Sequence, residues 1–89
     1  MTVVKMKRDG EHYRIEAKGH ATGSVEVCSA VSMLLFTLVN YVADRADYDL
    51  KSGDSWVEWF GSPIPYDMIS GGFQLLARDY PDYIKIERY

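Results

Sequence analysis

The stretch 19–32 holds the chain's single cysteine, Cys28, and one of its two histidines, His20, eight positions earlier. Glycine, serine and threonine fill much of the intervening loop, and the apolar spacing of a helix begins at about Cys28. Cys28 is therefore predicted at or near the first turn of a helix, where unpaired N–H groups and the helix dipole favour a thiolate. A histidine on the preceding segment can accept the thiol proton, so the pair predicts a cysteine nucleophile with its base.

Each of these residues also has an ordinary interpretation when it is taken alone. A lone cysteine at the start of a helix is commonly a small buried apolar residue, and a loop histidine is commonly just exposed. If the pair is catalytic, backbone N–H groups near the start of the helix are the candidates for stabilising an oxyanion. The sequence does not identify a third residue that orients His20; Glu26 is conceivable only if the loop geometry turns its side chain to the same side as Cys28.

A wider resemblance rests on the same segment. Gly19-His20-Ala21, a short loop, and then Val27-Cys28-Ser29-Ala30-Val31-Ser32 resembles the signature of the ribosomal-processing cysteine protease family, Prp. Asn40 falls late in the helix, as the family's asparagine does, and residues 75–84 are similar to its closing helix and strand. Two features differ. The loop before Cys28 is several residues shorter than is usual, and Val25 stands where the family has an acidic residue, with Glu26 following it.

The resemblance implies a cysteine endopeptidase that uses Cys28 and His20 and needs no cofactor. It implies a homodimer whose substrate is a large-subunit ribosomal protein, from which a short N-terminal extension is removed. The shortened loop supports a second interpretation, a dimeric peptide-binding or adaptor protein of the same fold that has lost turnover. A peptide would then add as a strand beside an open sheet edge.

Two hairpins and two helices are predicted to position the site. Alternating polar and apolar residues predict strands that flank turn dipeptides, and three- and four-residue apolar steps predict helices. A serine is the expected N-cap of the first helix. The predicted elements are strands 2–8 and 12–18 around Asp9-Gly10, a helix from the Ser24 cap to about Arg45, strands 48–51 and 56–60, a helix 66–79 and a strand 82–88.

The order β-β-α-β-β-α-β predicts an α+β fold, with a mainly antiparallel sheet of about five strands and two helices packed on one face. Residues 1–89 are expected to form one domain. The last strand is predicted to be paired within the sheet and not at an edge. Gly71-Gly72 predicts either a close approach to another backbone or a break in the second helix. The two tryptophans, Trp56 and Trp59, are assigned to the core, with a ligand platform as the alternative.

Composition narrows the classes of function. The net charge of −3 argues against a general nucleic-acid binder, because no basic face would neutralise phosphates. One cysteine cannot form an internal disulfide, and no CxxC or HExxH spacing predicts a metal site. The start of the chain lacks the apolar core of a signal peptide, and the longest apolar run, 33–36, is too short to span a bilayer. A cytoplasmic protein is expected. The first helix is apolar nearly all round, which suggests a dimer contact.

Overall fold

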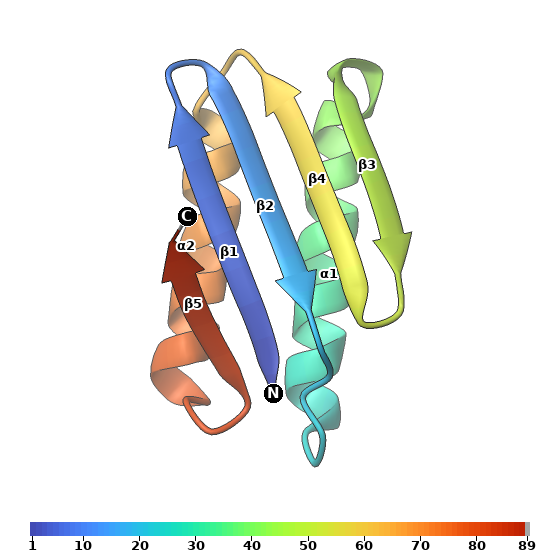
Figure 1. The fold of residues 1–89 in the computed structure, drawn as a ribbon, viewed down its shortest axis with the longest axis vertical. Helices are drawn as coiled ribbons and strands as arrows, with labels where there is room; N and C mark the ends of the chain where they lie inside the picture. The colour runs from blue at the N-terminus through green and yellow to red at the C-terminus, as the bar shows by residue number, and fades with distance from the viewer. Residues whose placement is uncertain (89) are drawn as a thin grey trace.

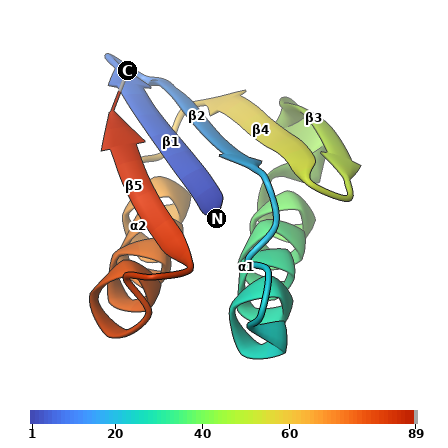
Figure 2. The same ribbon diagram turned by 60° about the horizontal axis from the view of Figure 1, so that its bottom comes forward.

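Five strands form one sheet in the order β3-β4-β2-β1-β5. The computed structural model describes residues 1–88, and both helices cover the same face of this sheet (Figures 1 and 2). The predicted α+β fold is confirmed. Its elements are β1 (Thr2–Asp9), β2 (His12–Lys18), α1 (Val25–Val42), a 3-10 turn η1 (Ala43–Arg45), β3 (Ala46–Lys51), β4 (Asp54–Phe60), α2 (Ile64–Asp79) and β5 (Ile84–Arg88).

The sheet is antiparallel except where β5 pairs with β1 in parallel. The prediction that the last strand avoids an edge is wrong, because β5 lies at one end of the strand order. The reason is the crossover through α2, which carries the chain from β4 past β2 and β1 to the far side of the sheet (Figure 1). Strand order is a long-range property that alternation within one segment does not encode.

Both hairpin turns are tighter than the sequence suggests. Asp9 still pairs with His12, so the first turn consists of Gly10 and Glu11. Lys51 pairs with Asp54, which leaves Ser52 and Gly53 as the second turn. β3 starts two residues earlier than predicted because its acidic residues obscure the strand pattern.

The core lies between the sheet and the two helices. Side chains with a period of two on the strands meet the apolar stripe of α1 and part of α2. Trp59 is buried, as predicted, but Trp56 lies on the opposite face of the sheet under the guanidinium of Arg14, 4.6 Å from the ring centroid. The most deeply buried side chains are Val4, Tyr13, Ile15, Val27, Leu38, Val42, Val57, Trp59, Phe73 and Ile84.

α1 begins where the sequence predicts. Ser24 is the N-cap, and its Oγ accepts a hydrogen bond from the N–H of Val27 at 3.2 Å. The segment 25–45 has 21 residues and contains an 18-residue window with a mean hydropathy of 1.7, so it is long and apolar enough to cross a membrane by length and composition alone. The expectation from the sequence considered only the continuous apolar run 33–36, which is too short to span a bilayer. In this fold the helix packs against the sheet, and core helices of globular proteins share the same property.

α2 runs without a break through Gly71 and Gly72, so a break in the helix at this point is excluded. A Cβ added at Gly72 would lie 2.7 Å from Cδ2 of Leu34 on α1, whereas one added at Gly71 meets nothing within 4 Å. The close approach therefore involves a side chain and not a backbone, and it involves only the second glycine. The helix starts two residues earlier than predicted, because Pro65 fits its first turn.

Candidate active site

The loop that carries His20 is fixed at Gly19, directly after β2. Gly19 has φ +87°, and an added Cβ would overlap the carbonyl oxygen of Met1, so only glycine fits. Its N–H donates to the carbonyl oxygen of Gly53 at 2.9 Å, and its own carbonyl accepts from Oγ1 of Thr2 at 3.3 Å. These contacts fix the backbone just before His20, whose side chain is exposed.

Cys28 is the fourth residue of α1, as the sequence predicts for a first-turn cysteine. Its N–H donates to the carbonyl oxygen of Ser24 at 3.3 Å, and its side chain is half-buried. The thiol donates to the carbonyl oxygen of Ala21 at 3.7 Å. The same oxygen accepts the N–H of Ser24 at 3.0 Å, so one buried alanine carbonyl joins the loop to the helix start.

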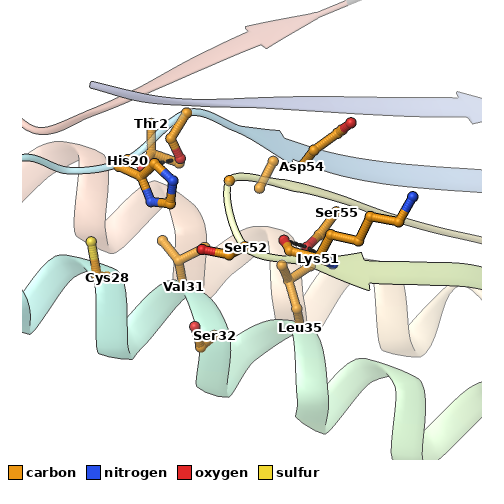
Figure 3. Close-up of a pocket in the computed structure, with 13 residues that line it drawn as sticks. Thr2, His20, Cys28, Val31, Ser32, Leu35, Lys51, Ser52, Asp54 and Ser55 are labelled. Atoms are coloured by element: carbon orange, nitrogen blue, oxygen red, sulfur yellow. Dashed lines mark hydrogen bonds between the residues drawn. The ribbon is translucent and has the colours of Figure 1, made fainter.

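His20 and Cys28 line the same pocket, a cavity of about 170 Å³ between the start of α1 and the turn that joins β3 to β4. Figure 3 shows the sulfur of Cys28 directed from α1 toward the segment that carries His20, and the imidazole extending from that segment toward α1. In the described part of the chain, the thiol's hydrogen bond goes to the backbone and not to the imidazole. The remaining lining residues are Thr2, Ala17, Gly19, Val31, Ser32, Leu35, Lys51, Ser52, Gly53, Asp54 and Ser55.

The first turn of α1 leaves two backbone donors free. An α-helix has four N–H groups at its start without an intrahelical acceptor. Here Ser24 N–H is taken by Ala21 and Val27 N–H by the Ser24 hydroxyl. Within residues 1–88, this leaves the N–H groups of Val25 and Glu26 as the donors available to an oxyanion. Of the backbone N–H groups near the start of the helix that were predicted as oxyanion donors, these two are therefore the candidates.

Among the described residues, Glu26 forms its carboxylate hydrogen bond with Ser24 and not with His20. Its carboxylate accepts a hydrogen bond from the hydroxyl of Ser24 at 3.3 Å, and it stands as an acidic residue in the first turn of α1. A carboxylate there is favoured by the helix dipole, which gives Glu26 a structural role in the helix start.

Among the described side chains that line the pocket, Lys51 is the one lysine or arginine. Asp49 forms an ion pair with the Lys51 ammonium at 3.0 Å, and this hydrogen bond together with the Asp49 charge raises the pKa of Lys51. The ammonium is therefore charged at neutral pH. Among the described residues, no group of three His, Cys, Asp or Glu side chains is arranged to hold a metal ion.

Sequence reasoning missed two residues at the site. Thr2 holds the carbonyl of Gly19, and Gly53 lies against the imidazole of His20. Gly53 carries a recognisable turn signal, but nothing local indicates that the turn reaches a histidine more than thirty positions away. Thr2 has no signal at all, because its role depends on β1 pairing beside the end of β2 (Figure 1).

A thiol and an imidazole that share a pocket at a helix start form the type of site that cysteine hydrolases use. The sequence model of the cysteine protease Prp family matches residues 1–85. This chain therefore belongs to the cysteine protease Prp family, as its sequence motif indicated.

Solved structures share the fold. The essential ribosomal processing protease Prp from S. aureus, in complex with a covalently linked product peptide, has 18% sequence identity and a TM-score of 0.85, with 100% of both chains covered. The same protease with a substrate peptide gives a TM-score of 0.80 at 18% identity, again with 100% of each chain covered. SMU.848 from Streptococcus mutans gives 0.73 at 23% identity, with coverage of 99% of this chain and 96% of its own. No curated protein sequence matches this chain.

Proposed function

We propose that this protein is a cysteine endopeptidase in which Cys28 is the nucleophile and His20 the general base. The observation that carries the proposal is that both side chains line one pocket at the start of α1. Membership of the cysteine protease Prp family supports it independently. A first-turn sulfur and an imidazole on a neighbouring segment also support this assignment, because thiol proteases activate a cysteine with a nearby base.

Catalysis then begins with rotation of the Cys28 side chain away from the Ala21 carbonyl, so that the imidazole accepts the thiol proton. The thiolate attacks the scissile carbonyl carbon, and the N–H groups of Val25 and Glu26 stabilise the oxyanion. The protonated His20 donates its proton to the leaving amine as the C–N bond breaks. Water, deprotonated by the same imidazole, hydrolyses the thioester and regenerates the thiol.

The proposed substrate is the precursor of a large-subunit ribosomal protein, and the released product is its short N-terminal extension. The support comes from the family and from the two S. aureus structures, which are described as a ribosomal processing protease with substrate and product peptides. Ribosome maturation takes place in the cytoplasm, and we propose that compartment for this protein.

A second candidate is a peptide-binding adaptor of the same fold without turnover. Two observations favour it: the thiol is hydrogen-bonded to a backbone carbonyl, and β3 lies at the edge of the sheet, where a peptide strand can add. Binding would then need neither Cys28 nor His20.

The test is cleavage of synthetic peptides that span the N-terminus of each large-subunit ribosomal protein of the source cell, read by mass spectrometry. Wild type should cleave one of them, whereas Cys28→Ala and His20→Ala should bind that peptide without cleaving it. Ser29→Ala, an exposed change on the next residue of α1, is the matched control and should keep activity. Equal binding and no cleavage by all four proteins would favour the adaptor.

We also propose that the protein acts as a homodimer through the outer face of α1. Met33, Phe36 and Tyr41 are 66%, 57% and 60% exposed on this helix, which is an unusual concentration of large apolar side chains for a surface. The same face of α1 borders a shallow depression that reaches Cys28 and Asn40, so a second copy placed here would lie beside the site.

A further inference from the structure

We propose that Gly53, in the turn between β3 and β4, is a positioning residue for His20. The inference rests on the proposed catalytic role of His20, and it adds to the site an element that is remote in the sequence. The turn consists of Ser52 and Gly53, closed by the pairing of Lys51 with Asp54. Both turn residues line the pocket that holds His20 and Cys28, and Figure 3 shows Ser52 there.

The contact between Gly53 and the imidazole is so close that a side chain on Gly53 would require the ring to move. A Cβ built on Gly53 would lie 2.6 Å from Nε2 of His20, 3.1 Å from Cε1 and 3.2 Å from Cδ2. The Nε2 side of the ring therefore rests against the bare Cα of the turn. Since the side chain of His20 is otherwise exposed, this contact limits the rotamers that the ring can adopt.

The turn also holds the backbone that carries the ring. The carbonyl oxygen of Gly53 accepts the N–H of Gly19, the residue before His20, at 2.9 Å. Gly53 thus constrains His20 in two ways. Its carbonyl oxygen holds the backbone before His20, and its Cα, which carries no side chain, lies against the ring. A base must sit within hydrogen-bond reach of the proton it takes, so a displaced ring lowers the rate without removing any reacting group.

Gly53 has φ +75°, and this conformation alone favours glycine, so the test needs a control for backbone strain. Gly10 provides it. It lies in the β1–β2 turn with φ +62°, and an added Cβ there meets nothing within 4 Å. Gly53→Ala and Gly10→Ala should therefore lose similar stability, while only Gly53→Ala should displace the ring of His20.

The expected results separate the two variants in three measurements. In peptide cleavage, Gly53→Ala should lower kcat about 10²-fold while KM changes less than about threefold, and Gly10→Ala should leave both near wild type. Alkylation of Cys28 at neutral pH should slow only in Gly53→Ala. In NMR spectra, the ring signals of His20 should shift in Gly53→Ala, and those of His12, two residues from Gly10, should shift only in Gly10→Ala.

A double variant shows whether Gly53 acts through His20. Adding Gly53→Ala to His20→Ala should cause no further slowing of Cys28 alkylation, because the ring that the new Cβ displaces is gone. If Gly53→Ala alone fails to fold, the double variant should regain folding for the same reason. Equal losses of kcat in Gly53→Ala and Gly10→Ala would overturn the proposal. A double variant that does not fold, or whose Cys28 is alkylated more slowly than in His20→Ala, would also overturn it.

The outcomes also distinguish this inference from the proposed function. A wild type that cleaves no peptide, together with normal Cys28 alkylation in His20→Ala, would refute the catalytic pair but leave the ring contact measurable by NMR. A wild type that cleaves, with His20 signals unmoved in Gly53→Ala, would refute the role of Gly53 and leave the protease intact.

Discussion

The thiol of Cys28 donates to the carbonyl oxygen of Ala21, the residue that follows His20. The candidate nucleophile is thus tied to the loop that carries its candidate base, and the same carbonyl accepts the N–H of Ser24 at the helix start. Movement of this loop changes both the position of the imidazole and the environment of the sulfur. The site is thus built from a loop, a helix start and a turn that hydrogen bonds connect.

Replacing His20 by alanine should slow alkylation of Cys28 by iodoacetamide at neutral pH about tenfold or more, because the thiol loses the base that takes its proton. His12→Ala is the matched control. His12 is the other histidine, and it lies on β2 beside Glu58 and Phe60, among residues that do not line the site pocket. Equal rates for His20→Ala and wild type would contradict any activation of the sulfur by this ring.

Replacing Ser24 by alanine should destabilise the protein by about 1 kcal/mol, because the N–H of Val27 loses its acceptor at the start of α1. The measurement is urea unfolding followed by circular dichroism. Ser29→Ala, an exposed change within the same helix, should alter the free energy of unfolding by less than about 0.5 kcal/mol. Similar values for both variants would mean that the cap contributes little.

The two adjacent glycines of α2 should respond differently to alanine. Gly71→Ala has open space around its new methyl group and should stabilise the protein by about 0.5–1 kcal/mol through helix propensity. Gly72→Ala presses its methyl group on Leu34 and should lose that gain or destabilise. Thermal unfolding of both variants checks this. An equal gain at both positions would show that α1 and α2 are not in close contact there.

The proposed dimer predicts that Phe36→Glu gives a monomer in size-exclusion chromatography with light scattering, since a charge would be buried in the interface. Met68→Glu is the control, because Met68 is 70% exposed on α2 and lies outside the proposed face. Wild type that runs as a monomer, or two variants that dissociate equally, would contradict an interface on α1.

The sequence predicted most of the fold because its signals are local. Alternation located the strands, Ser24 marked the start of α1, and the motif around Cys28 identified the family. The position of β5 at an edge and the crossing of Leu34 over Gly72 depend on how distant elements pack, and no window of neighbouring residues encodes them.

In the candidate site too, residues with local sequence signals were predicted, and residues that depend on long-range packing were missed. His20 and Cys28 were predicted from their types and spacing, and the structure places them in one pocket. Thr2 and Gly53 were missed, because they reach the site through strand pairing and a hairpin turn. Glu26 was considered as a partner of His20 on spacing alone, but the helix start directs it to Ser24.

The most direct test of the central claim is the intact mass of the protein after rapid acid quenching of its reaction with a cleaved peptide or its ester. We expect a transient mass increase equal to the acyl part of the substrate, located on Cys28 by peptide mapping and absent in Cys28→Ala. Cleavage that persists in Cys28→Ala, or an acyl group on any other residue, would contradict a cysteine protease built on Cys28 and His20.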